Sequence, residues 1–290
     1  MATAALLARG LNAHRQGHNW RCVCPLGCGY SLSICDTEDG KLLTHCFGGC
    51  EHDEIYTALV EHGLFDDDDP VCHDLSPSVR PSAPDDAKRI AAARWAYDQL
   101  GPAVGSIAEL YLRARGITIE VPTVLRFGPC PHRIGGTFPT MAAPVVDIHG
   151  EQTGVHMTFL RADGTGKAEF GSRDLQRECR GVIHGGTIRL AEHAPDRDLI
   201  LAEGIESTMS AMQIFALPGW AAVSAGGLKT LELPPEVRSI IIAADNDVSG
   251  VGQRNAVAAH DRWRAEGRQV RVALPPAVGD FNDVLRKRNQ

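Results

Sequence analysis

The alternation of apolar and polar positions is clearest from residue 198 to the end of the chain. Segments there that are nearly continuous in apolar residues predict strands at 199–204, 219–227, 237–245 and 269–275. Segments between them repeat apolar residues at helical spacing and predict helices at 205–215, 228–233 and 252–267. Because uninterrupted apolar strands alternating with helices are typical of a sheet covered on both faces, this region predicts an α/β fold with a parallel sheet.

The part of the chain before residue 198 divides into segments that differ in hydrophobic periodicity and in composition. Helical spacing of apolar residues recurs at 53–65, 87–100 and 106–116, and short strands and turns are expected within 117–190. Acidic residues, Pro and Ser dominate the segment at 66–84, which keeps no hydrophobic period and therefore resembles a linker. We expect four parts: a small domain at 1–65, the linker at 66–84, a mixed α+β subdomain at 85–196 and the α/β domain at 197–290.

Composition narrows the functional classes. The chain has 290 residues, of which 43% are hydrophobic and 22% charged, as in ordinary globular proteins. Its net charge of −7 argues against a generic nucleic-acid coat, so a nucleic-acid role requires a local basic patch or bound metal cations. The sequence contains no apolar stretch long enough for a membrane span and no signal-peptide pattern at its N-terminus, so we expect a cytoplasmic protein without membrane contact.

Six of the nine cysteines lie between residues 22 and 50. Cys24 and Cys28 form one C-x-x-x-C pair, Cys46 and Cys50 form a second, and the segment between the pairs resembles a β-hairpin. Two such pairs joined by a hairpin predict a tetrahedral Zn²⁺ site of the zinc-ribbon type, which would stabilise a segment too small to fold alone. Two alternatives stay open: Cys22 replaces Cys24 as a ligand, or the cysteines are reduced and structural.

Acidic residues follow the predicted strands of the α/β domain. Asp245 and Asp247 differ by two positions, so their side chains point to the same face about 6–7 Å apart and repel each other unless a cation lies between them. Glu203 ends an earlier strand, and Asp280 and Asp283 follow the last one. Carboxylates at the carboxyl ends of neighbouring parallel strands predict a site for Mg²⁺ or Mn²⁺. In the alternative interpretation, Asp245 and Asp247 are only turn and helix N-cap residues.

The acidic segments resemble the Toprim domain of primases and topoisomerases over about 197–288. The "LAEGIES" segment matches its Glu-Gly motif with Glu203, and "AADNDVSG" matches its Asp-x-Asp motif with Asp245 and Asp247. The "VGDFND" segment is similar to a further acidic motif of primases, with Asp280 as the best match. The resemblance implies that the Asp pair binds Mg²⁺ and that Glu203 is a metal ligand or a general acid or base.

Two more segments resemble parts of primases. "CPLGCGYSLSI" and "HCFGGC" are similar to the N-terminal zinc-binding domain of bacterial and phage primases, except that Gly27 replaces the usual His and Cys28 would serve as the ligand. "GEQTGVHMTFLRADGTGKAEFGS" resembles the strand–turn–strand passage that precedes Toprim in primases, where Arg161 and Lys167 would contact nucleotide or template. The alternative for both side chains is a solvated face.

Together, the resemblances imply a plasmid- or phage-type DNA primase, which synthesises short RNA primers by metal-dependent nucleotidyl transfer. Its expected partners are a single-stranded DNA template, ribonucleoside triphosphates and a replicative helicase in trans. The zinc ribbon would engage the template through exposed aromatic residues, or these residues close its small core: Trp20, Tyr30 and Phe47. Two other classes remain open, a Toprim-type nuclease that uses the same acids and a non-catalytic, zinc-containing DNA-binding protein.

Overall fold

A computed structural model describes most of the chain. The described residues are 4–16, 19–26, 31–36, 42–46, 50, 52–64, 86–171, 175–223, 225–248 and 250–288. The chain divides into two compact units, residues 1–81 and 82–290, which are described separately as unit 1 and unit 2. The predicted linker at 66–84 lies outside the described residues.

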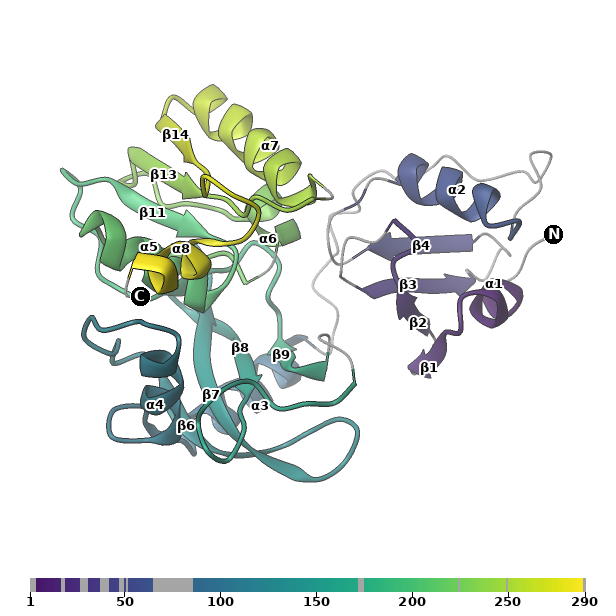
Figure 1. The fold of residues 1–290 in the computed structure, drawn as a ribbon, viewed down its shortest axis with the longest axis horizontal. Helices are drawn as coiled ribbons and strands as arrows, with labels where there is room; N and C mark the ends of the chain where they lie inside the picture. The colour runs from purple at the N-terminus through teal and green to yellow at the C-terminus, as the bar shows by residue number, and fades with distance from the viewer. Residues whose placement is uncertain are drawn as a thin grey trace. The chain divides into compact units, whose positions relative to one another are not determined.

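Unit 1 is built on an antiparallel sheet in the order β1-β2-β3-β4 (Figure 1). Its strands are β1 (His14–Gln16), β2 (Asn19–Val23), β3 (Ser31–Asp36) and β4 (Leu42–Cys46). Its helices are α1 (Ala4–Gly10) and α2 (His52–Glu61). The core formed by the described residues is small. Its large aliphatic side chains come from α1, β3 and α2, namely Leu7, Leu32, Ile34, Ile55 and Leu59, and Ala4, Cys22, Cys24 and Cys46 complete it. A core of this size favours an additional stabilising element, such as a bound metal.

The first sheet of unit 2 is an antiparallel meander in the order β5-β6-β7-β8-β9. Its strands are β5 (Gly101–Pro102), β6 (Arg126–Pro131), β7 (Thr137–Val146), β8 (Gln152–Phe159) and β9 (Arg177–Gly181). Helix α3 (Asp86–Asp98) packs against β8 and β9, and α4 (Ile107–Ala114) begins at Ser106, whose Oγ accepts the Ala108 N–H at 3.1 Å. This part is the mixed α+β region expected from the sequence.

The second sheet of unit 2 has the order β10-β12-β11-β13-β14 and is parallel except for β10. Its strands are β10 (Ile188–Arg189), β11 (Leu199–Ala202), β12 (Gly219–Ala221), β13 (Ser239–Ala243) and β14 (Gln269–Ala273). Its helices are α5 (Ile205–Phe215), α6 (Ala225–Thr230), α7 (Val251–Ala265) and α8 (Phe281–Arg288). The predicted α/β fold class is therefore confirmed.

Both faces of this parallel sheet are covered, as its apolar strands require. Leu199 and Leu201 of β11 pack with Trp263 of α7, whereas the alternate residues Ile200 and Ala202 pack on the α5 and α8 side (Figure 1). Three elements differ from the sequence-based prediction. The strand expected at 219–227 ends at residue 221, and α6 starts at 225 within a Gly-rich segment of low helix propensity, while α8 was not anticipated.

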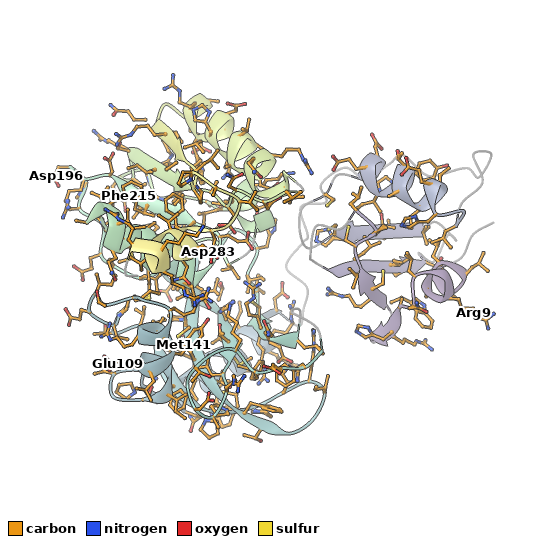
Figure 2. All side chains as sticks on the ribbon, viewed as in Figure 1. Arg9, Glu109, Met141, Asp196, Phe215 and Asp283 are labelled. Carbon is orange, nitrogen blue, oxygen red and sulfur yellow. The ribbon has the colours of Figure 1, made fainter. Side chains whose placement is uncertain are left out.

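The two sheets of unit 2 are joined through backbone and core. Val146 of β7 and Thr187 exchange both N–H···O hydrogen bonds, each at 2.9 Å. One apolar cluster contains residues from α4, β7, α5 and α8, namely Tyr111, Leu112, Met141, Met209 and Leu285. Figure 2 draws these side chains and labels Met141 on β7 and Asp283 on α8. Among the described residues, no helix combines the length and the apolar character that a membrane span needs.

Candidate functional site

Strand register brings the acidic segments to one edge of the parallel sheet. Ala202 of β11 pairs with Ala243 of β13, and Ala243 pairs with Ala273 of β14, so the three strands end together. Beyond this edge, Asn246 and Gly279 exchange backbone hydrogen bonds at 3.0 and 2.9 Å. This isolated bridge holds the loop that carries Asp280 beside the loop that carries Asp245 and Asp247.

Asp245 is the least satisfied of these acids. Its Oδ1 is buried and has no hydrogen-bond partner among the described residues. Burial, followed by the charges of Asp280 and Asp247, raises the pKa of Asp245 to about 7. Burial also raises the pKa of Asp280. A carboxylate in this position is costly unless a cation compensates its charge, so the donor set fits a divalent metal.

Asp247 and Asp280 also serve as helix caps. The two carboxylate oxygens of Asp247 accept the N–H groups of Val251 and Gly252 at 3.2 and 2.7 Å, at the start of α7. Asp280 Oδ1 accepts the Asp283 N–H at 2.8 Å, before α8. The N-cap residue of α7 is Gly250, so Asp247 supports the start of this helix from three residues earlier, and the N-cap interpretation does not account for Asp245. Capping fixes both side chains at the sheet edge without using all of their lone pairs.

The acidic residues gather at this edge in an open arrangement. Three potential ligand atoms of His, Cys, Asp or Glu can hold a metal closely when they lie within 4.8 Å of one another. Within the described part of the chain, cysteines form such a group and the acids do not. Glu203, Asp245, Asp247 and Asp280 therefore do not close around a point in the way a structural metal site does. An open set of hard oxygen ligands fits Mg²⁺ or Mn²⁺, which take their remaining ligands from water and phosphate.

Lys167 enters the same region from the first sheet. It lies just after β8, where it forms an isolated bridge with Leu160, and its Nζ lies 2.8 Å from Glu206 Oε1. Only 20% of its side chain is exposed. Arg161 differs, because its side chain is 47% exposed and its guanidinium pairs with Glu169 at 2.9 Å and Asp163 at 3.5 Å within its own turn. The structure brings Lys167, but not Arg161, to helix α5.

Several residues of the site were missed by sequence reasoning. Glu206 is 7% exposed in the first turn of α5 and accepts the Tyr111 hydroxyl at 2.6 Å. Arg177 of β9 lies opposite Thr158. Its charge acts on Glu206, Lys167 and Asp245. The sequence contains a weak indication of Glu206, because this acid lies three residues after Glu203. Arg177 is brought to the site only by tertiary packing, which the sequence pattern does not show.

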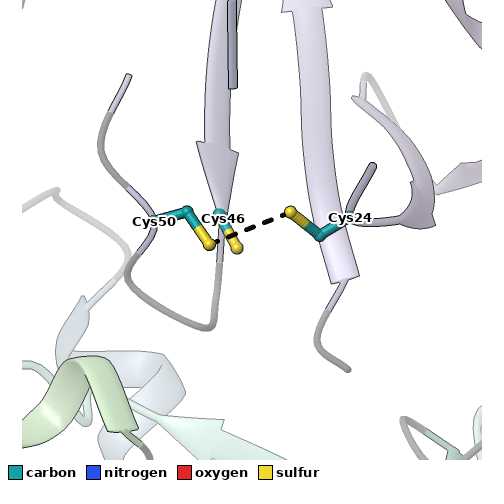
Figure 3. Close-up of side chains that lie close together, drawn as sticks. All are labelled: Cys24, Cys46 and Cys50. Atoms are coloured by element: carbon teal, nitrogen blue, oxygen red, sulfur yellow. Dashed lines mark hydrogen bonds between the residues drawn. The ribbon is translucent and has the colours of Figure 1, made fainter. Parts of the chain in front are cut away.

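The cysteine cluster of unit 1 is a separate candidate metal centre. The Sγ atoms of Cys24, Cys46 and Cys50 lie within 4.8 Å of one another, and the Cys24–Cys50 distance is 4.0 Å (Figure 3). Four sulfurs held at ~2.3 Å around one tetrahedral zinc are about 3.8 Å apart, whereas a disulfide needs about 2.05 Å. The cluster contains Cys24 rather than Cys22, whose Sγ points to the Leu32 carbonyl at 3.8 Å. Cys28 lies outside the described residues.

Comparison with known families addresses the C-terminal part directly. Residues 198–290 match the family model of the Toprim domain. The C-terminal part of the chain is a Toprim domain. The sheet edge that carries Glu203, Asp245 and Asp247 is therefore the edge at which the Toprim motifs recognised in the sequence lie. Residues 87–190 match the model of a domain of unknown function (DUF7146).

Solved structures similar to this chain include three primases. The zinc-binding and RNA polymerase domains of the Aquifex aeolicus primase are 14% identical, with 99% of this chain and 80% of that one covered and a TM-score of 0.46. The primase fragment of the bacteriophage T7 primase-helicase protein is 14% identical, with 65% and 69% covered and a TM-score of 0.42. The E. coli primase catalytic core is 17% identical, with 70% and 75% covered and a TM-score of 0.43.

The cysteine geometry predicts that the purified protein carries about one zinc ion held by thiolates. Replacing Cys46 or Cys50 with Ser should release the metal and unfold unit 1, because zinc-binding energy is folding energy in a segment with so small a core. Elemental analysis measures the metal, and circular dichroism measures the folding. Cys179→Ser is the matched control, since Cys179 is an exposed cysteine of unit 2 and should leave the zinc content unchanged. Metal-free protein from a chelator-free preparation would rule out the site.

The raised pKa of Asp245 predicts a pH-dependent stability. Between its ordinary pKa near 4 and its folded pKa of about 7, the folded protein binds more protons than the unfolded chain, so stability falls as the pH rises through this window. Asp245→Asn removes the ionisable group and with it this loss of stability at high pH. Its Tm should exceed that of the wild type at pH 8, by roughly 2–4 °C per kcal/mol recovered, and the gain should shrink at pH 5.

Mg²⁺ provides a second readout in the same experiment. It should raise the wild-type Tm at pH 8 more than that of Asp245→Asn, because the variant lacks the charge that the metal neutralises. Asp196→Asn is the control, since Asp196 is exposed and precedes the amino end of β11, at the opposite edge of the sheet (Figure 2). Equal pH profiles for the wild type and Asp245→Asn would contradict a buried, unsatisfied carboxylate at this position.

Proposed function

We propose that the protein is a DNA primase that synthesises short RNA primers on single-stranded DNA by metal-dependent nucleotidyl transfer, in the replication of a plasmid, phage or other mobile element. One observation carries the proposal: in a Toprim domain, the charge of Arg177 acts both on the unsatisfied carboxylate of Asp245 and on Lys167. Acids that need a cation, next to side chains that bind phosphate, are the two components of a phosphoryl-transfer site.

The acids at the sheet edge would have two different roles, metal binding and proton transfer. Asp245 and Asp247, with Asp280, would hold Mg²⁺ or Mn²⁺. The metal supplies positive charge to the triphosphate oxygens and to the phosphoryl group that is transferred. Glu203, at the end of β11, would either complete the metal site or accept the proton of the attacking hydroxyl group. Asp247 and Asp280 are held in place by the starts of α7 and α8, so they need little reorganisation when substrate binds.

The basic residues would contact the substrates. Lys167 pairs with Glu206, and the charge of Arg177 acts on Asp245. Both cations would bind nucleotide phosphates, because Arg and Lys are strong donors to phosphate oxygens. Arg161, exposed on its turn, would contact the template backbone further out. A chain with a net charge of −7 needs local positive charge to bind nucleic acid. Lys167, Arg177 and Arg161 would provide it.

Unit 1 would present the template. The guanidinium of Arg15 lies 5.9 Å from the centroid of the Trp20 ring, so a base-stacking side chain and a phosphate-binding side chain are adjacent on β1 and β2. Trp20 also packs against the core of unit 1, which supports the alternative that it only closes this core. Tyr30 and Phe47 lie outside the described residues. We keep the domain boundaries 1–65, 66–84, 85–196 and 197–290 as part of the proposal, together with a helicase partner in trans.

A Toprim-type nuclease is the second candidate, because the same acids and metal can cleave a phosphodiester bond. The cysteine cluster and the basic side chains from the first sheet favour the primase, since hydrolysis needs no site for a nucleoside triphosphate. Parallel incubations separate the two candidates, one with single-stranded template and labelled ribonucleotides and one with labelled DNA alone. A non-catalytic DNA-binding protein would give neither primers nor cleavage products.

The primase proposal predicts that Asp245→Asn and Asp247→Asn each lower Mg²⁺- or Mn²⁺-dependent primer synthesis by roughly 10²-fold or more, because each removes a metal-binding charge. The stability effects should differ. Both oxygens of Asp247 accept N–H groups and Asn offers one acceptor oxygen, so Asp247→Asn should lose part of this support, whereas Asp247→Ala should lose all of it at a cost of about 1 kcal/mol. Full synthesis by both Asn variants would leave Asp247 as a cap only and would exclude the metal-site assignment.

A further inference from the structure

Three elements of unit 2 converge on one carboxylate oxygen. Glu206 Oε1, in the first turn of α5, accepts the Tyr111 hydroxyl of α4 at 2.6 Å and lies 2.8 Å from Lys167 Nζ. Tyr111 is 1% exposed, and the side chain of Glu206 is 9% exposed. The contacts cross from the first sheet to the Toprim domain, within the part of unit 2 that also shares an apolar core.

The charges of this network depend on one another. Burial would raise the pKa of Glu206, but the ammonium of Lys167 and the hydrogen bonds from Lys167 and Tyr111 hold that pKa well below the usual range. Burial lowers the pKa of Lys167, and the carboxylate of Glu206 opposes this effect. Burial and the charge of Glu206 raise the pKa of Tyr111, so its hydroxyl stays protonated and donates. Without Glu206, a half-buried lysine here would lose its proton more readily.

Other ionisable groups face the pair from every packed element. They are Arg115 after α4, His156 of β8, Arg177 of β9 and Asp280 before α8. Both arginines lower the pKa of Lys167 further. Burial lowers the pKa of His156 to about 3, so this imidazole is neutral. Glu206 is therefore the negative group that keeps Lys167 charged among these cations.

We propose that Glu206 is a positioning residue of the nucleotide site. It holds Lys167 as an ammonium beside Arg177, so that the two cations together receive the phosphates of the incoming nucleoside triphosphate, and Tyr111 fixes Glu206 for this task. This inference rests on the proposed function, because it concerns the same site and the same substrate class. It adds to that function a residue which acts through Lys167 and need not touch substrate.

Glu206→Gln is the primary test, because it keeps the size of the side chain and an oxygen for Tyr111 but removes the charge. We expect the KM for ATP in primer synthesis to rise about tenfold, as for the loss of a charged hydrogen bond, with a smaller change in kcat. The pH profile should shift as well. With the carboxylate gone, Lys167 loses its proton at a lower pH, so ATP affinity should begin to fall at a lower pH than in the wild type.

Further variants separate positioning from a merely structural role. Lys167→Gln should raise the KM, and adding Glu206→Gln to it should cause little further change, because Glu206 acts through the missing ammonium. Tyr111→Phe keeps both charges, so it should raise the KM less and leave the pH profile in place. Glu120→Gln removes an exposed carboxylate on the loop after α4 and should match the wild type. If Glu206→Gln folds poorly, the Lys167 and Tyr111 variants carry the test.

Calorimetry can measure ATP binding by the 290-residue chain. This measurement distinguishes a failure of the primase proposal from a failure of the inference about Glu206. Binding without primer synthesis would count against the primase, while the affinities of the variants would still decide the role of Glu206. A wild-type KM and pH profile in Glu206→Gln, with a lower Tm alone, would overturn the inference. Additive effects in the double variant would overturn it as well, because Glu206 would then act independently of Lys167. Absence of ATP binding in the wild type would overturn both proposals.

Discussion

Negative charge at the carboxyl edge of the parallel sheet is the constraint to which the rest of unit 2 responds. The register of β11, β13 and β14 makes the acidic segments meet, and the Asn246–Gly279 bridge adds Asp280. The first turns of α7 and α8 donate N–H groups to Asp247 and Asp280, and helix N-termini favour negative charge. Asp245 receives no such support within the described residues and is therefore the carboxylate with the most to gain from a cation.

The compensating positive charge comes from a different sheet. Lys167 follows β8 and Arg177 lies on β9, so their distance from the acids depends on how the meander packs against the Toprim domain. That packing is specified by the backbone pairing of Val146 with Thr187 and by a common apolar core. A substitution in this core can therefore displace Lys167 and Arg177 without touching a charged residue, and well-oriented groups lose much of their effect when displaced by about 1 Å.

The sequence predicted those features that depend on a local pattern of residues. Continuous apolar strands identified the parallel sheet, and the motifs around Glu203 and Asp245 indicated the sheet edge at which a metal site is proposed. Helix α8 was missed because its start, from Asp280 to Asp283, was interpreted only as acidic ligands, although the same residues cap a helix. The contact between Lys167 and Glu206 could not be predicted, because the two residues belong to segments whose packing the sequence pattern leaves open.

The two candidate metal centres differ in the way their chemistry requires. Cys24, Cys46 and Cys50 converge closely in a unit with a small core, which suits a closed, structural site of soft ligands. The acids of the Toprim domain stay further apart, and two of them already bind helix N-termini. Closing that set around an ion would satisfy Asp245 but would remove the positions at which phosphate oxygens can bind. If the proposed function is correct, an incompletely satisfied Asp245 is the physical cost of keeping the site open to substrate.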